Sequence, residues 1–243
     1  MDRLTTLMER FHLSVQAAPV AEANLFVYAG AEGQPTRLVF FPAGGRVFDT
    51  REQIILSARV EWSGQRNPLL AALPGMVDYD LSQSPEAQSL VRLMQDEVEG
   101  GRCGAQSVVN RLGEVLMVRL LRQQIERGTT EPGLLAGLSD ARLSRAIVAM
   151  HDHPGRVWSN SDLAQQAGLS LSRFCQLFAA EVGETPMGYL RRWRLILARQ
   201  DLLRGDRVEA VARRYAYGSP EGFSRAFKRA YGVAPMALRR TAA

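Results

Sequence analysis

Hydrophobic positions recur at two spacings along the chain, and they predict a β-rich first part followed by helices. Apolar residues within 4–11 fall at helical spacing, which predicts a short amphipathic helix. After residue 12 the pattern changes to short β-like runs at 25–28, 38–41 and 53–62, separated by breaks that contain Gly and Pro. Several short strands in so few residues predict a small antiparallel sheet or a partial barrel.

From Pro85 onwards the pattern is helical. Residues 86–98 and 105–127 flank Gly100-Gly101, which predicts an antiparallel helical hairpin. The second of these helices is apolar on more than one face, as in a helix that packs on two sides. Its second side could contact another subunit, or the helix could simply be buried in its own domain. The stretch GTTEPGLLAG has the composition of an interdomain linker, which we expect at residues 131–139.

The last hundred residues contain an internal repeat. Residue types coincide at a shift of 48 and then 49 positions, as in Leu169/Tyr217, Phe174/Phe223, Phe178/Phe227, Gly183/Gly232 and Pro186/Pro235. Each copy predicts a helix, a tight turn and a second helix that begins after Ser170 or Ser219. This arrangement is a helix-turn-helix.

The second helix of each copy has an apolar and a polar face at 100° per residue. The predicted core positions are Leu171, Phe174, Leu177, Phe178 and Val182 in the first copy and Phe223, Ala226, Phe227, Ala230 and Tyr231 in the second. The polar faces carry Ser172, Arg173 and Gln176 in the first copy and Glu221, Ser224, Arg225 and Lys228 in the second. Solvated faces alone would explain this pattern, so a DNA-binding interpretation depends on the repeat, the capped turns and the charge together.

One continuous helix is predicted between the copies, at residues 186–204. Its length of roughly 28 Å would hold two recognition helices about one DNA turn apart. The helix also carries Arg191, Arg192, Arg194 and Arg199, some of which we expect in internal ion pairs.

Charge is divided unevenly between the two parts of the chain. Residues 1–140 hold 13 basic and 17 acidic residues, whereas residues 141–243 hold 17 and 8, a net charge of +9. A basic part of this kind predicts a polyanion-binding module attached to another domain. The whole chain, with 243 residues of which 46% are hydrophobic, excludes disordered and collagen-like classes. Two cysteines and no apolar run of about 20 residues predict a cytoplasmic protein without a membrane span.

The stretch SDLAQQAGLSLSRFCQLFAAEVGETPMGYLRRWRLILARQDLL, followed by VEAVARRYAYGSPEGFSRAFKRAYGVAPMALR, resembles the DNA-binding domain of the AraC/XylS family. The segment RNPLLAALPGMV and the helical hairpin resemble the subgroup with a cupin-type N-terminal domain. The resemblance implies a transcriptional regulator, usually an activator, that binds promoter DNA, works with RNA polymerase, and senses a signal or forms a homodimer through its N-terminal domain. The residues that it implies for the major grooves are Ser172, Cys175, Gln176, Pro220, Glu221, Ser224 and Arg225.

The sequence departs from the family pattern in two places. Ala216 stands where the family usually has Gly in the second turn. The region before the hairpin is shorter than a complete cupin, and the strands that would carry cupin metal ligands are missing, so no metal or sugar site is carried over. We therefore expect an α+β protein with a shortened cupin-like domain at 1–130 and a double helix-turn-helix domain at 140–243.

Other candidate chemistry in the sequence is sparse. His151-Asp152-His153 could suggest a metal site, but a histidine at a helix C-terminus also caps the helix. Cys103 follows Gly100-Gly101 and is either a redox sensor or an incidental thiol. A cupin-type enzyme would need several histidines on strands, and only His12 lies near them. We expect no catalytic residue, metal or cofactor. The alternative to an effector-controlled regulator is a DNA-binding module controlled by a partner protein.

Overall fold

A computed structural model describes residues 4–44, 52–62, 67–128 and 131–240, which form two compact units. One unit comprises Phe11–Arg127, and the other joins the residues up to Arg10 with those from Gly128 onwards. The helix α1 (Thr5–Arg10) thus belongs to the C-terminal unit, whereas the sequence predicted these residues in the N-terminal domain, 1–130. None of the described helices is both long enough and apolar enough to cross a membrane.

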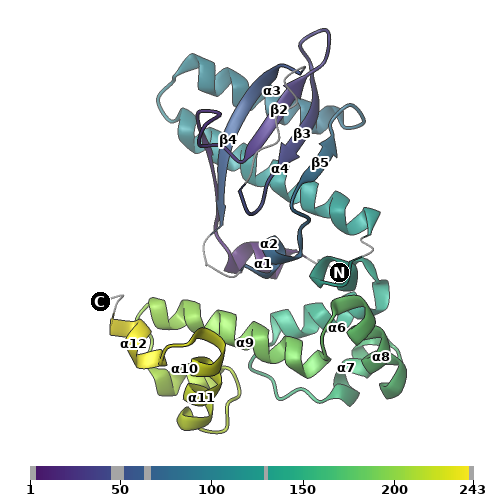
Figure 1. Ribbon diagram of the computed structural model, residues 1–243, viewed down its shortest axis with the longest axis vertical. Helices are drawn as coiled ribbons and strands as arrows, with labels where there is room; N and C mark the ends of the chain where they lie inside the picture. The colour runs from purple at the N-terminus through teal and green to yellow at the C-terminus, as the bar shows by residue number, and fades with distance from the viewer. Residues whose placement is uncertain (1–3, 45–51, 63–66, 129–130, 241–243) are drawn as a thin grey trace. The chain divides into compact units, whose positions relative to one another are not determined.

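The N-terminal unit is built on an open antiparallel sheet of five strands (Figure 1). The strands are β1 (Leu13–Ala17), β2 (Leu25–Ala29), β3 (Pro35–Phe40), β4 (Ile54–Trp62) and β5 (Val77–Asp80), in the order β1-β4-β2-β3-β5. This confirms the predicted antiparallel sheet. The two edge strands are not among the runs singled out in the sequence, because each is short and has few apolar residues.

Side chains on both faces of the central strand β2 are buried. Phe26 pairs with Val39 and Leu25 with Phe40, so alternate residues point to opposite faces. The predicted hairpin is present as α3 (Pro85–Gly100) and α4 (Ala105–Arg127), and a short helix α2 (Pro68–Ala72) precedes β5.

The helix α4 packs closely against β1, and a glycine makes this approach possible. A Cβ atom on Gly113 would lie 2.5 Å from the Cβ atom of Val15, closer than two carbon atoms can approach. Away from β1, α4 leaves Val108 41% exposed and Val115 47% exposed. The helix therefore carries apolar side chains that its own unit does not cover.

The C-terminal unit consists of helices only. They are α1, α5 (Leu134–Ser139), α6 (Ala141–Asp152), α7 (Asn160–Ala167), α8 (Leu171–Val182), α9 (Pro186–Leu203), α10 (Val208–Arg214), α11 (Pro220–Tyr231) and α12 (Pro235–Arg240). The predicted long helix is present as α9, with α7 and α8 towards one end and α10 and α11 towards the other (Figure 1).

The segment expected as a linker contains helix α5 instead of extended chain. Leu134, Leu135 and Leu138 are buried, and α5 packs on α6 and α8. Burying three leucines stabilises this helix more than leaving them in an exposed connection would. Residues 129–130, within the linker-like stretch, lie outside the described residues.

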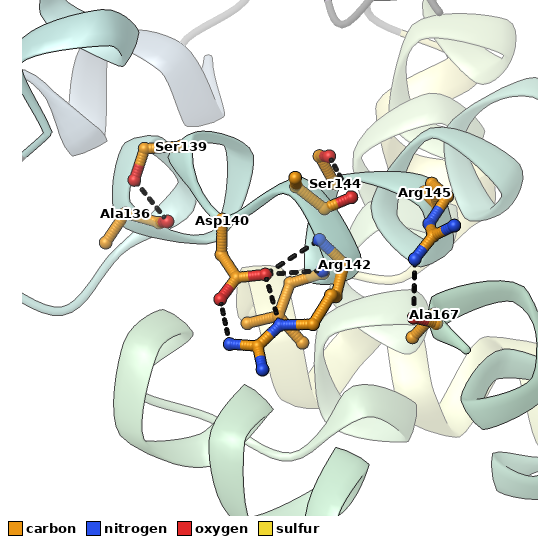
Figure 2. Close-up of polar contacts among 9 residues, drawn as sticks. Ala136, Ser139, Asp140, Arg142, Ser144, Arg145 and Ala167 are labelled. Carbon is orange, nitrogen blue, oxygen red and sulfur yellow. Dashed lines mark hydrogen bonds and ion pairs between the residues drawn. The ribbon is translucent and has the colours of Figure 1, made fainter. Parts of the chain in front are cut away.

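Asp140 connects α5 to α6 and holds the start of α6 in place (Figure 2). Its carboxylate accepts hydrogen bonds from the backbone N–H groups of Arg142 at 2.7 Å and Leu143 at 3.1 Å. The Arg142 side chain also donates to this carboxylate, and together these bonds lower the pKa of Asp140 to about 2. Asp140 is an N-cap that stays ionised at neutral pH.

Candidate nucleic-acid interface

The first helix-turn-helix consists of α7, a tight turn and α8. Ser159 and Asp162 form a capping box at the start of α7, and Gly168 ends this helix with φ of +67°. The Ser170 hydroxyl then accepts a hydrogen bond from the backbone N–H of Arg173, which caps α8. The side chain of Arg145 donates to the Ala167 carbonyl at 2.9 Å and ties the end of α7 to α6 (Figure 2).

The helix α8 has the two faces that its sequence predicts, with one exception. Phe174, Leu177, Phe178 and Val182 are buried. Leu171 was expected in the core and is 48% exposed, so that prediction is wrong. It is the first helical residue, at the edge of the turn and outside the stripe that faces α7 and α9. Ser172, Arg173 and Gln176 are exposed, and Cys175 is half-buried.

The second helix-turn-helix consists of α10, a turn and α11. Ala216 in this turn has φ of +56°, the left-handed conformation that Gly168 adopts in the first copy. The Ser219 hydroxyl accepts a hydrogen bond from the backbone N–H of Gly222 at 3.0 Å, and Pro220 occupies the first turn of α11. The repeat in sequence is therefore a repeat in local structure.

The helix α11 is amphipathic, with an aromatic core face. Phe223 and Phe227 are fully buried, while Ala226, Ala230 and Tyr231 are half-buried. Glu221, Arg225 and Lys228 are exposed on the opposite side, with Pro220 and Ser224 half-buried beside them. Arg225 forms no hydrogen bond or ion pair with any residue that the structure describes, including Glu221 one turn earlier.

We expect Ala216→Gly to stabilise the second helix-turn-helix. A left-handed alanine costs about 1–2 kcal/mol that glycine avoids, partly offset by the larger entropy of glycine in the unfolded chain. Thermal unfolding should therefore show a higher midpoint for the C-terminal unit. The matched change Gly168→Ala in the first copy should lower that midpoint, because a Cβ atom there fits sterically but the φ angle is +67°. A lower midpoint for Ala216→Gly would contradict this explanation.

The arginines of α9 divide between internal contacts and solvent. Arg192 donates to the Glu184 carboxylate, with Nε at 2.9 Å. Arg194 donates from Nε to the Pro154 carbonyl and from Nη2 to the Arg156 carbonyl, both at 2.7 Å. Arg191 is exposed, and Arg199 lies over the Tyr231 ring at 5.9 Å. Internal contacts were expected for some of these arginines, and the structure identifies which.

Known protein families match both parts of the chain. A helix-turn-helix domain family matches residues 163–241, and a cupin family matches residues 10–126. An AraC-like transcription regulator of Streptomyces lividans is 32% identical over 199 residues, which cover 81% of this chain and 62% of that protein. The chain carries an AraC-family helix-turn-helix domain. It carries a cupin domain before its helix-turn-helix domain.

One further relative and one solved structure are also similar to this chain. The HTH-type transcriptional regulator AlkR of Acinetobacter baylyi is 30% identical over 178 residues, which cover 71% of this chain and 58% of AlkR. A solved AraC-type regulator of Chromobacterium violaceum is 24% identical and covers 43% of this chain and 95% of that chain, with a TM-score of 0.41. The chain spans 58–62% of the length of the curated relatives described above.

The AraC-family domain contains a buried carboxylate that the sequence pattern did not predict. Asp201, near the end of α9, is 1% exposed. Its carboxylate pairs with the guanidinium groups of Arg204 and Arg214 and accepts a hydrogen bond from the Tyr215 hydroxyl at 2.7 Å. Arg214 also pairs with Asp206 at 2.6 Å. Asp201 therefore joins α9 to α10; the available sequence signal was an acidic residue at a core position of the long helix.

His153 is the C-cap of α6, as expected for a histidine at this helix end, whereas His151 is a buried core residue of this AraC-family domain. Its Nε2 atom lies 2.5 Å from the Tyr189 hydroxyl oxygen, and its ring lies 4.3 Å from that of Trp193. Burial, with a smaller effect of Arg192, lowers the pKa of His151 to about 3 and keeps it neutral. Among the described residues, no group of three or more His, Cys, Asp or Glu could hold a metal ion.

Proposed function

We propose that this protein is a sequence-specific DNA-binding transcription regulator, acting as an activator, which inserts α8 and α11 into adjacent major grooves of promoter DNA. The observation that carries the proposal is the repeated unit towards the two ends of α9, each with a capped second helix that presents an exposed polar face. A helix of 18 residues is about 27 Å long, and helices packed at its two ends can reach successive major grooves, which lie about 34 Å apart on one side of the duplex.

The exposed faces suggest a role for each residue. We assign groove contacts to Ser172, Arg173, Cys175 and Gln176 on α8 and to Pro220, Glu221, Ser224, Arg225 and Lys228 on α11. Arg173, Arg225 and Lys228 are cations without a described protein partner, so DNA can bind them without breaking an internal contact. Arg213 on α10 is also exposed, and we assign it to the phosphate backbone.

The salt dependence of binding tests this function. If both units contact one duplex, several arginines neutralise phosphates, and log K should fall by about 0.9 for each neutralised contact per decade of salt. Titration of the full chain against promoter DNA fragments at four ionic strengths should give a steep slope. Removing one phosphate contact with Arg213→Ala should reduce the slope by about one. A flat salt response would contradict DNA binding through the phosphate backbone.

We further propose that the N-terminal domain controls binding and forms a homodimer through the exposed side of α4. Val108 and Val115 are seven residues apart and so lie on the same side of this helix. We expect Val115→Glu to yield monomers in sedimentation experiments, because a buried interfacial carboxylate is strongly unfavourable. Glu114→Gln, which alters a half-buried neighbour without adding charge, should leave the dimer intact. A wild-type chain that is monomeric at micromolar concentration would remove the dimer proposal.

The remaining assignments follow from this function. A promoter-binding activator works with RNA polymerase at the chromosome, so we place the protein in the cytoplasm, and we do not propose an enzymatic activity. The N-terminal domain would respond to a small-molecule effector of unknown identity. Control by a partner protein is the alternative, and native mass spectrometry of the purified full chain would distinguish a retained small molecule from a stable protein complex.

A further inference from the structure

A cleft of about 730 Å³ lies within the C-terminal unit, between the end of α1, the turn that follows α6, and the ends of α9 and α10. Its charged lining consists of Arg10, Arg156, Arg204, Arg214, Asp152 and Asp201. These residues come from the end of α1, the end of α6 and the turn that follows it, and the ends of α9 and α10. The volume is within the range of small-molecule sites, and the proposed DNA contacts use none of these four arginines.

Two of the arginines are already paired at the floor of the cleft but keep unused donors. The Asp201 side chain is 2% exposed and pairs with Arg204 and Arg214, whose side chains are 61% and 49% exposed. Arg204 uses its Nη2 for this contact, and Arg214 uses only its Nη1 for Asp201 and Asp206. A guanidinium has five N–H donors, so both side chains can still donate to a ligand in the cleft.

The other two arginines form no salt bridge within 4 Å of a carboxylate among the described residues, although Arg156 interacts electrostatically with Asp162 at longer range. The backbone carbonyl of Arg10 accepts a hydrogen bond from the Gln200 side chain at 3.1 Å. The Arg156 guanidinium lies 4.0 Å from the centre of the Trp158 ring, which holds it in place by a cation–π contact. The nearby carboxylate of Asp152 accepts a hydrogen bond from the Thr6 hydroxyl. The cleft therefore contains two guanidinium groups that form no salt bridge with a described carboxylate.

The wall that carries Arg156 is fixed by hydrogen bonds. Arg194 holds the carbonyls of Pro154 and Arg156, and the Trp158 Nε1 donates to the His153 carbonyl at 3.0 Å. A Cβ atom on Gly155 would lie 2.3 Å from the Arg214 carbonyl oxygen, so the turn between α6 and α7 lies directly against the end of α10. A rigid wall lowers the entropy cost of binding a ligand.

We propose that this cleft binds a small anion with a carboxylate or phosphate group, held by Arg10, Arg156 and the unused donors of Arg204 and Arg214. Guanidinium groups match both kinds of oxyanion in shape and charge. In Figure 1, α1 and α11 lie on opposite sides of α9, so we assign the anion to a free small molecule instead of a DNA phosphate. Because its ligands come from α1, the turn between α6 and α7, and the ends of α9 and α10, the bound anion stabilises the arrangement of these helices.

Calorimetric titration of the full chain with inorganic phosphate, and separately with citrate, tests this site at constant ionic strength. We expect saturable binding of at least one of these probes at a single site. The double variant Arg10→Gln/Arg156→Gln should weaken that binding about tenfold or more, because it removes two charge-assisted contacts. Neither side chain pairs with Asp201, so unfolding without added anion should change only by the loss of the Arg156–Trp158 cation–π contact.

The control variant Arg213→Gln/Arg229→Gln removes the same charge from exposed positions outside the cleft and should keep wild-type affinity for the anion. Binding that does not saturate, or that weakens equally in both double variants, would overturn the proposal. A third titration uses DNA without phosphate or citrate. In this titration the variant Arg10→Gln/Arg156→Gln should bind DNA as tightly as the wild type. Weaker DNA binding with unchanged anion binding would overturn the proposal, because it would assign Arg10 and Arg156 to contacts with the DNA backbone.

Discussion

Arg225→Ala should weaken binding to the cognate DNA site about tenfold or more, and non-specific DNA much less. Arg225 is exposed on α11, two residues after the buried Phe223 and therefore about 200° around the helix from it. This places the guanidinium on the side away from the core. A bidentate arginine–guanine contact contributes about 1–3 kcal/mol of discrimination, whereas a phosphate contact contributes none.

Competition binding with single-base variants of a selected site would measure this effect. Arg225→Ala should equalise the affinities at one base position and leave the discrimination at other positions intact. The matched control is Arg213→Ala on α10, an exposed arginine that should lower affinity for all sequences alike. Arg225 has no described protein partner, so its loss should not change stability. Equal losses on every DNA variant would mean that Arg225 binds only phosphate.

Asp201→Ala should destabilise the C-terminal unit by about 2–4 kcal/mol. The substitution leaves the Tyr215 hydroxyl without its 2.7 Å acceptor and removes the carboxylate that connects α9 to Arg214 on α10. The expected loss of stability is smaller than for a fully buried ion pair, because Arg204 and Arg214 reach solvent and can be hydrated after the change.

Denaturant unfolding of the full chain, followed through the transition of the C-terminal unit, would measure the loss. Asp206→Ala is the matched control, because Asp206 pairs with the same Arg214 but its side chain is 36% exposed. Partly exposed ion pairs contribute about 0–1 kcal/mol, so this variant should stay close to wild type. Equal losses in the two variants would show that burial of Asp201 does not determine its contribution.

The sequence by itself determined the local structure of the C-terminal domain. Ser170, Ser219 and the glycines at 183 and 232 mark helix ends through contacts with residues at most a few positions away. Phe174, Phe178, Phe223 and Phe227 define a core face through helical spacing alone. Both kinds of information are contained in a window of a few residues, so the double helix-turn-helix and its exposed polar faces could be predicted.

Only the tertiary structure decided which polar side chains are used inside the protein. His151 contacts Tyr189, 38 positions away, and Arg194 holds a carbonyl 40 positions away. The sequence pattern around Asp201 likewise does not reveal Arg214 as its partner. The placement of α1 with the C-terminal unit was also decided by long-range packing. A buried polar atom is stabilised by whichever partner folding brings within hydrogen-bond distance, and that partner is set by the packing of whole helices and not by local spacing.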